Sequence, residues 1–194
     1  MDNFLPDHTI DQIITSQLHE KDVEFDSRRQ ANNHLDLGYQ ETESQLRAPI
    51  LNAFSKLLFS KNIEVDFIIP MPGSAVGWIE AFNKLRVYSP EIISLRKVTR
   101  RKFELIDDID ESKYANKQGI VFDDTTIDGG SGEAAADYLT DSKFAITAIV
   151  SLFVRGEQLA KSSYPRFCIA HRLIPSNLDW KKFRQQGKIE QLRS

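Results

Sequence analysis

Apolar and polar positions along the middle of the chain follow a pattern that predicts strands followed by helices. Residues 65–69 (VDFII) form a short apolar run that ends at the sequence PMPGS, which is typical of a strand and a turn. Helical spacing then continues over residues 75–85 through Val76, Ile79, Phe82 and Leu85. The order of strand, glycine-bearing turn and helix predicts a βα unit.

A second unit of the same kind follows. The apolar residues 120–122 end at the adjacent carboxylates Asp123 and Asp124, and residues 132–139 are predicted as an alanine-rich helix. Residues 144–153 (FAITAIVSLF) are almost all apolar, as expected for a strand that is covered on both faces. The alternation of strands and helices predicts an α/β fold with an open, mainly parallel sheet flanked by helices.

The first part of the chain is more polar. A short amphipathic helix is predicted from the spacing of Ile10, Ile13, Ile14 and Leu18. Irregular structure is predicted through residues 26–34 (DSRRQANNH). A core helix is predicted from Ser44, with Pro49 in its first turn and Asn62 at its end. Its apolar face contains Ile50, Leu51, Phe54, Leu57 and Leu58.

The remaining segments give weaker signals. Residues 91–98 are predicted as a strand, and residues 103–118, which are rich in charge and lack a clean period, as a long mobile loop or ribbon. The segment from Arg155 to Ser194 contains a short apolar run at 166–174 and a basic end. We find no internal repeat, and the chain length predicts a single domain over residues 1–194.

Composition and charge narrow the function classes. The chain is 41% hydrophobic and 27% charged, as in soluble globular proteins. Its net charge of -3 provides no basic field, so neither nucleic acid nor a membrane surface is an expected partner. The N-terminus lacks signal-peptide features and no apolar run approaches the length of a membrane span. The single cysteine, Cys168, fits a reducing cytoplasm, and His8, His19 and His34 share no metal-ligand spacing, which favours surface positions.

Candidate chemistry is concentrated in residues 119–137 (GIVFDDTTIDGGSGEAAAD). A buried strand is expected to stop at Asp123 and Asp124, and the small residues that follow form a loop able to wrap an anion. The next helix directs its N-terminus at this loop, where its backbone N–H groups favour phosphate. The segment therefore predicts a phosphate site beside two acids.

Other binding motifs fit less well. Gly130, Gly132 and Ala135 satisfy a G-x-G-x-x-A dinucleotide pattern, but seven residues including two acids separate it from its strand. An EF-hand loop that begins at Asp124 would need a glutamate where Ala135 stands. The chain has no G-x-x-x-x-G-K-[ST] sequence, which excludes a P-loop NTPase. A dinucleotide-binding module remains a minor alternative.

The segment IVFDDTTIDGGS resembles the signature of the type I phosphoribosyltransferases, which use phosphoribosyl pyrophosphate (PRPP). Its ending is similar to that of the adenine and uracil enzymes, and its acid pair to that of the orotate, adenine and amidotransferase branches. IIPMPGSAVGW (68–78) stands where this family has its pyrophosphate loop, and LRKVTRRK (95–102) where basic residues lead into a flexible catalytic loop. The resemblance implies a core over about residues 44–154 and a small hood from residues 1–43 and 155–194.

The resemblance also implies roles for individual residues. The 5′-phosphate is expected on Thr126, Ile127, Asp128, Gly129, Gly130, Ser131 and Gly132. The ribose hydroxyls are expected on Asp123 and Asp124, directly or through waters of Mg²⁺, the expected cofactor. Pyrophosphate binding is expected from Gly73, Ser74, Ala75 and Arg96. Catalytic roles are implied for Asp123, Asp124, Lys97, Arg100, Arg101 and Lys102.

Two residues depart from the family pattern. Ile127 stands where the hypoxanthine and guanine enzymes have a base-activating aspartate, which argues against that type of purine salvage. Asp128 would place a carboxylate beside a bound dianion, so its side chain is expected to turn outward. A base-stacking aromatic in the hood would be Trp180 or Phe183.

Taken together, these features favour transfer of phosphoribosyl from PRPP to a nitrogen of a base or base-like acceptor, with Mg²⁺. The alternative is a regulatory protein that keeps the fold and senses PRPP or a nucleotide without turnover. Asp128 and the unplaced hood favour the alternative, and the acid pair and basic run favour the enzyme. Expected partners are PRPP and a base or nucleotide, and the resemblance makes a homodimer possible.

Overall fold

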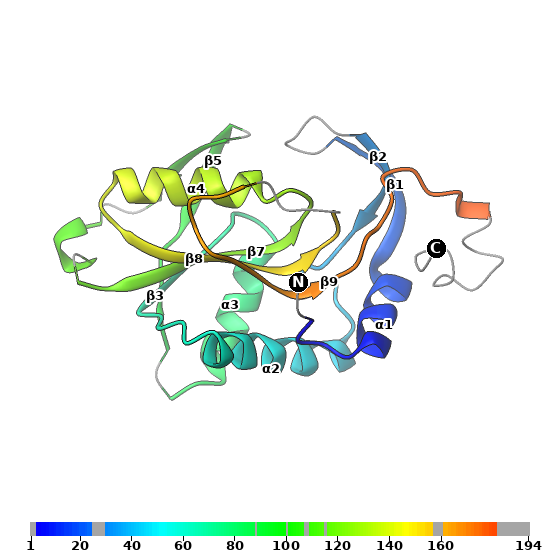
Figure 1. Cartoon of the computed structure of the whole chain (residues 1–194), viewed down its shortest axis with the longest axis horizontal. Helices are drawn as coiled ribbons and strands as arrows, with labels where there is room; N and C mark the ends of the chain where they lie inside the picture. The colour runs from blue at the N-terminus through cyan, green and yellow to red at the C-terminus, as the bar shows by residue number, and fades with distance from the viewer. Residues whose placement is uncertain are drawn as a thin grey trace.

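The computed structural model describes residues 3–24, 30–87, 89–99, 101–106, 109–114, 116–156 and 161–181. Within these residues the centre of the molecule is a five-stranded parallel sheet in the order β4-β3-β7-β8-β9 (Figure 1). The strands are β4 (Glu91–Ile92), β3 (Phe67–Pro70), β7 (Gln118–Thr126), β8 (Ala145–Val154) and β9 (Arg166–His171). The predicted α/β class with an open parallel sheet is confirmed.

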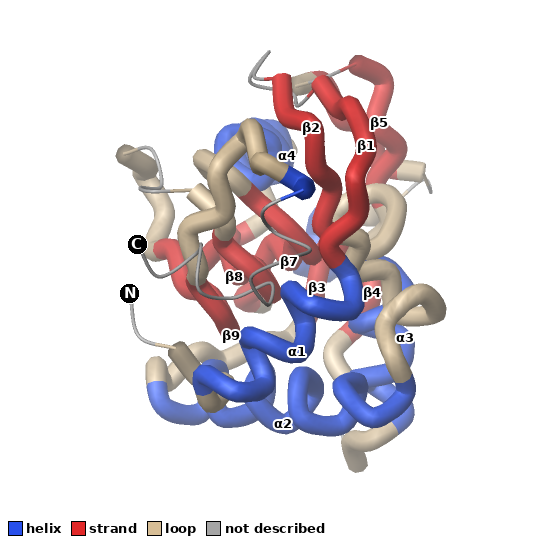
Figure 2. Tube along the Cα trace, turned by 90° about the vertical axis from the view of Figure 1, so that its right-hand side faces the viewer, coloured by secondary structure: helices blue, strands red, loops and turns tan. Residues whose placement is uncertain are grey.

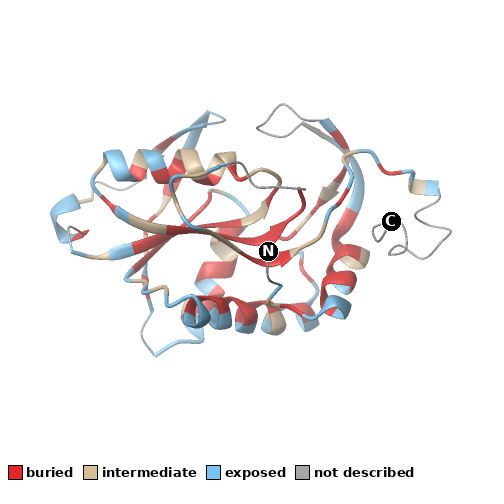
Figure 3. Ribbon diagram, viewed as in Figure 1, coloured by how far each residue is buried: buried red, intermediate tan, exposed pale blue. Residues whose placement is uncertain are grey.

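Helices cover both faces of the sheet (Figure 1). α4 (Gly130–Asp141) lies on one face, and α2 (Ser44–Ser60) and α3 (Ala75–Lys84) lie on the other. Each of these helices contains buried residues, which Figure 3 marks in red along its ribbon. The ring of Phe54 in α2 lies 4.6 Å from that of Phe82 in α3 and 5.0 Å from that of Phe122 in β7. These aromatic contacts fix one helical layer on the sheet.

β7 occupies the middle of the sheet, and its position places the motif. Its residues from Gly119 to Asp123 are buried because β3 and β8 flank it and helices cover both faces. Phe122 pairs with Pro70 of β3, and Thr126 pairs with Val154 of β8. Since all these strands run in one direction, residues that follow β3, β7 and β8 meet at the same edge.

Two antiparallel ribbons stand at one end of the molecule (Figure 2). β1 (Leu18–Glu24), which follows α1 (Asp7–Gln17), pairs with β2 (Gln30–Leu35), and β5 (Leu95–Thr99) pairs with β6 (Lys102–Leu105). A short 3-10 helix, η1 (Glu111–Tyr114), precedes β7. The described part of the chain contains no helix that is long and apolar enough to cross a membrane.

The two ends of the chain pack together, as a hood from both termini requires. The side-chain amide of Asn32 in β2 donates to the carbonyl of Leu178 at 2.9 Å, and its backbone N–H donates to Ser176 at 2.9 Å. The indole of Trp180 donates to the carbonyl of Asn32 at 3.0 Å. Trp180 is therefore a packing residue of the hood, and the prediction that it stacks a base is not supported. Phe183, the other candidate, lies outside the described residues.

Four predicted elements need correction. Residues 30–34 form most of strand β2 rather than irregular structure, because the buried Asn33 side chain donates to the carbonyls of Pro175 and Ser176 at 3.0 Å each. Pro49 lies inside α2 rather than in its first turn. The helix begins at Ser44, which places Pro49 beyond the first turn, and Arg47 donates to the carbonyls of Thr42 and Gln40 in the entering chain.

The other two corrections concern strands. The predicted strand 91–98 is two strands, because β4 joins the parallel sheet and β5 leaves it to pair with β6. β7 does not stop at the acids but continues through Asp123 and Asp124 to Thr126, since β8 pairs with it over that length. The residues that follow Lys102 were predicted as a long loop or a ribbon, and the ribbon is confirmed for β6. The apolar run at 166–174 contains β9.

Candidate functional site

A cavity of about 360 Å³ opens at the carboxyl edge of the sheet, where open α/β sheets bind their ligands. The largest continuous part of its wall comes from the end of β7 and from the loop that joins β7 to α4 (residues 127–129, the β7–α4 loop). The lining residues are His34, Leu35, Met71, Pro72, Gly73, Ser74, Lys97, Asp123, Asp124, Thr125, Thr126, Ile127, Asp128, Ser131 and Arg155.

The two acids form a coupled pair within this cavity. Burial, together with the neighbouring charge of Asp124, raises the pKa of Asp123 well above its usual range, and the Lys97 ammonium partly opposes this effect. Burial likewise raises the pKa of Asp124. Asp123 is the more buried of the two, and the charge of Asp124 adds to the effect of burial on its pKa. A hydroxyl donor or a cation placed beside the pair would stabilise the ionised carboxylates.

The β7–α4 loop has the conformation of an anion-binding turn. Gly129 adopts φ 78°, a left-handed conformation that other residues rarely accept, and α4 begins at the next residue. The N–H of Gly129 donates to the hydroxyl of Thr126 at 2.9 Å. The first N–H groups of α4 therefore point out of the helix at the edge of the cavity, where the helix dipole favours an anion.

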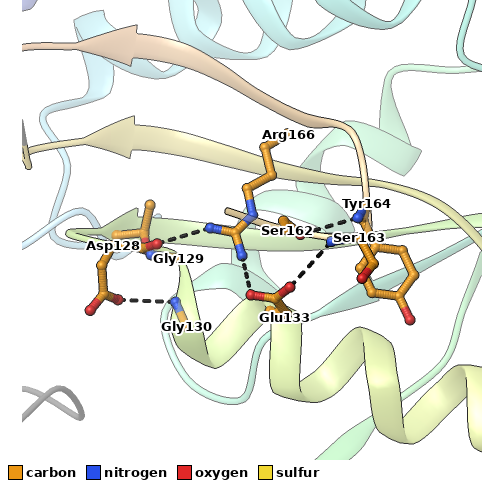
Figure 4. Close-up of polar contacts among 9 residues, drawn as sticks. Asp128, Gly129, Gly130, Glu133, Ser162, Ser163, Tyr164 and Arg166 are labelled. Carbon is orange, nitrogen blue, oxygen red and sulfur yellow. Dashed lines mark hydrogen bonds and ion pairs between the residues drawn. The ribbon is translucent and has the colours of Figure 1, made fainter. Parts of the chain in front are cut away.

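Asp128 does not turn outward, and this prediction is wrong. Its carboxylate folds back onto the helix terminus, where Oδ1 accepts from the N–H of Gly130 at 3.0 Å (Figure 4), and the residue lines the cavity. The physical reason is that the first amides of a helix lack acceptors within the helix, so a nearby carboxylate satisfies one of them. An anion of the protein itself thus occupies one donor of the predicted phosphate site.

The predicted basic residues take different positions. Lys97 lines the cavity, whereas Arg96 points to the other side of β5 and pairs with Glu104 at 2.7 Å, with its side chain 68% exposed. Arg101 reaches α4, where its Nη2 lies 3.4 Å from the point that a Cβ on Gly130 would occupy. Lys102 is exposed and is not part of the cavity lining. Arg100 lies outside the described residues.

The predicted glycine and small residues are also divided. Gly73 and Ser74 line the cavity, whereas Ala75 is buried at the start of α3 and makes no part of the lining. Thr126, Ile127, Asp128 and Ser131 line it. Gly129, Gly130 and Gly132 do not, and Gly132 instead packs closely against Ile149 of β8. The structure therefore brings together Asp123, Asp124, Lys97 and parts of both predicted phosphate loops.

Two titratable residues of the cavity were not predicted to lie there. Arg155, which follows β8, is only 3% exposed, and burial lowers its pKa to about 10. Its guanidinium donates to the side-chain oxygen of Asn33 in the hood. Its place directly after a predicted strand is a signal that could have found it, since the ends of parallel strands share one edge.

His34 is the second such residue, and the predicted surface position is wrong for it. It lies half-buried in β2 and lines the cavity. Burial is the main cause that lowers its pKa below 6.5; the charges of Lys21 and Arg155 act in the same direction, and Asp36 and Asp124 oppose them. No local pattern could have found His34, because the ribbon that carries it was predicted as irregular.

The donor set does not amount to a resident metal site. Among the described residues, no group of three or more histidine, cysteine or carboxylate side chains could hold a metal ion. Two adjacent carboxylates are nevertheless suited to Mg²⁺, which commonly takes one or two carboxylates and completes its shell with water and substrate phosphates. The residues present therefore fit a magnesium ion that arrives with a phosphorylated ligand.

Comparison with solved structures identifies the fold. The orotate phosphoribosyltransferase of Mycobacterium tuberculosis, solved with inorganic phosphate, matches with a TM-score of 0.60 and 13% identity over 84% of this chain and 94% of that one. The orotate phosphoribosyltransferase of Aeropyrum pernix matches with a TM-score of 0.59 and 12% identity over 92% of this chain and 98% of that one. The adenine phosphoribosyltransferase of Saccharomyces cerevisiae matches with a TM-score of 0.56 and 16% identity over 84% of this chain and 99% of that one. No protein-family model and no curated protein sequence matches the chain.

These matches bear out the resemblance at the level of fold. The chain has the type I phosphoribosyltransferase fold, with a five-stranded parallel sheet and flanking helices. Structural relatives with this architecture are phosphoribosyltransferases of orotate and adenine.

Proposed function

We propose that the chain binds PRPP together with Mg²⁺ and transfers its phosphoribosyl group to a nitrogen of a base or base-like acceptor, with release of pyrophosphate. The observation that carries this proposal is the shared cavity at the carboxyl edge of the sheet. It joins the acid pair Asp123 and Asp124 to the β7–α4 loop on one side and to Gly73, Ser74 and Lys97 on the other.

The acid pair is suited to the ribose. As the bond between C1 and pyrophosphate breaks, positive charge develops on the sugar ring, and two carboxylates that hold the 2′- and 3′-hydroxyls stabilise that charge. A hydroxyl that donates to Asp124 also replaces part of the hydration that burial removed. Asp123 and Asp124 are thus our candidates for the ribose contact, and they would also hold Mg²⁺, which would offset the negative charge of the leaving pyrophosphate.

Both phosphate groups of PRPP have candidate partners. We place the 5′-phosphate at the β7–α4 loop and Ser131, where the helix N-terminus favours an anion. The pyrophosphate would lie near Ser74 and Lys97, whose ammonium also offsets the charge of Asp123. Arg101 is close enough to the start of α4 to add positive charge near the 5′-phosphate.

The acceptor would lie beneath the hood. When the acceptor nitrogen bonds to C1 it must lose its proton, and His34 is a candidate base because its lowered pKa keeps it neutral at pH 7. Arg155 is a buried cation in the same cavity, which favours an acceptor that carries negative charge or a strong acceptor oxygen. The proposed acceptor class is therefore a base with an acidic or carbonyl-rich edge.

One observation favours the second candidate function, a sensor of PRPP or nucleotides without turnover. The Asp128 carboxylate takes the N–H of Gly130, which a tight phosphate site would leave for its ligand. A protein that binds phosphate only weakly or conditionally would suit a regulatory role. In either case a homodimer and a cytoplasmic location stay predictions.

The two functions are separated by measuring pyrophosphate release from PRPP with a panel of bases that includes orotate, uracil and adenine. Release that depends on one base supports phosphoribosyl transfer, and an Asp124→Asn variant serves as the inactive control. Saturable PRPP binding without release across the panel would favour the sensor. Absence of both binding and release would contradict both.

A further inference from the structure

The β7–α4 loop is held from behind by a buried arginine of β9. The Arg166 side chain is only 7% exposed, and it is not part of the cavity lining. Its Nη1 donates to the carbonyl of Asp128 at 2.9 Å, and its Nη2 pairs with a carboxylate oxygen of Glu133 at 2.6 Å (Figure 4). One guanidinium thus joins the loop to the first turn of α4.

The partner of Arg166 is itself held in place. The other carboxylate oxygen of Glu133 accepts from the backbone N–H of Ser163 at 3.4 Å. Gly156, which follows β8, lies so close to the loop that an added Cβ would stand 2.1 Å from the carbonyl oxygen of Ile127. Gly156 therefore packs directly against the loop, and Ser163 contacts α4 through Glu133.

Anchoring a carbonyl also sets the direction of the next amide. In a trans peptide the C=O and the following N–H point in opposite directions. With the carbonyl of Asp128 turned back to Arg166, the N–H of Gly129 must point to the opposite side, where it donates to the Thr126 hydroxyl at the cavity wall. The same turn presents the N–H of Gly130, which Asp128 Oδ1 now accepts.

We infer that Arg166 is a positioning residue that holds the β7–α4 loop through the carbonyl of Asp128 and through Glu133, so that the loop keeps the turn from which α4 begins. The role requires two donors in a fixed fork, which arginine has and lysine lacks. The ligand side of this inference rests on the proposed function, because only then does the loop bind the 5′-phosphate. The structural side concerns the loop alone.

The experiment uses the full chain with Arg166→Met and Arg166→Lys, and with Arg172→Met as the matched control. Arg172 directly follows β9, and its side chain is 17% exposed. It pairs with Asp7 and Asp11 at 3.3 and 3.4 Å, away from the loop. Hydrogen–deuterium exchange of peptides over residues 127–132 is compared with that over residues 118–124. Calorimetry measures ribose 5-phosphate binding.

Both Arg166 variants should raise exchange over residues 127–132 at least tenfold without changing residues 118–124, and should weaken ribose 5-phosphate binding at least tenfold. Arg172→Met should change neither. Full rescue by Arg166→Lys, or an equal rise of exchange along β7, would overturn the positioning role. If the parent chain binds no ribose 5-phosphate or PRPP, the proposed function fails, while the exchange result still decides the role of Arg166.

Discussion

The cavity has two walls that arise in different ways. The sheet wall, made of Asp123, Asp124, Thr126, Asp128 and Ser131, comes from one continuous segment of β7, its loop and α4. The hood wall, made of His34, Leu35 and Arg155, joins residues that lie far apart in the sequence. From this difference we expect the sheet wall to bind what all phosphoribosyl donors share and the hood wall to select the acceptor.

Electrostatics separates the walls further. The sheet wall concentrates carboxylates whose pKa values burial raises, whereas the hood wall carries a buried cation and a histidine whose pKa burial lowers. A ligand with hydroxyls at one end and a polar or acidic acceptor at the other would satisfy both. The predictions below test the walls separately.

The largest effect is expected at the sheet wall. Replacing Asp123 and Asp124 together by Asn removes two charged contacts of about 2 kcal/mol each, so PRPP affinity should fall on the order of 1,000-fold by calorimetry. The unliganded fold should become more stable at pH 7. The pKa of each acid is raised by folding, so their ionisation costs stability as pH rises above the unfolded value of 3.8. If the double variant bound PRPP as tightly as the parent, Asp123 and Asp124 would not be the residues that bind the ribose.

The next effect tests the hood wall. His34→Gln should lower kcat roughly 100-fold if the imidazole accepts the acceptor's proton. Because burial lowers the pKa of His34, the parent's activity should decline only below pH 6.5, where the ring becomes charged, and this acid limb should vanish in the variant. His19→Gln is the control, since His19 pairs opposite His34 but is exposed. An unchanged pH profile would reject His34 as the base.

Arg155→Met should separate the walls most clearly. The variant loses a charge-assisted contact to the acceptor, so the acceptor KM should rise about 10- to 100-fold. PRPP affinity should stay within about twofold of the parent, because Arg155 belongs to the hood wall. Steady-state kinetics with varied acceptor and varied PRPP measures both. Equal losses for the two substrates would show that the walls are not independent.

The smallest effect concerns the anion within the sheet wall. Asp128→Asn keeps an oxygen that accepts from Gly130 but removes the charge beside the 5′-phosphate. PRPP affinity should rise about tenfold, or about 1.4 kcal/mol, because two like charges no longer share the helix terminus. Asp141→Asn, at the exposed opposite end of α4, should have no effect. A loss of affinity in Asp128→Asn would show that the carboxylate serves the ligand rather than opposing it.

The sheet wall could be predicted because its information is local. Apolar runs and helical spacing located β3, α3, β7, α4 and β8, and the acids stand at the end of one of those runs. The end of β7 and the orientation of Asp128 could not be predicted. Pairing with β8 extends the strand, and the free amide of Gly130 attracts the carboxylate.

The hood wall could not be predicted because its strand depends on distant partners. Asn32 and Asn33 are poor strand residues by composition, and their side-chain amides donate to carbonyls of the C-terminal segment, at Leu178, Pro175 and Ser176. Without these hydrogen bonds, the apolar and polar pattern of β1 and β2 does not predict a hairpin. His34 and the partner of Arg155 depend on this hairpin.

The central claim, that the cavity is a PRPP site, is tested most directly by thermal unfolding with PRPP and Mg²⁺. At a hundredfold excess over the dissociation constant the bound state gains about 2.7 kcal/mol, which for a chain of 194 residues raises Tm by roughly 5–11 °C. The shift should largely disappear when Asp123 and Asp124 are both replaced by Asn. No shift with PRPP in the parent chain, or an undiminished shift in the double variant, would contradict the account.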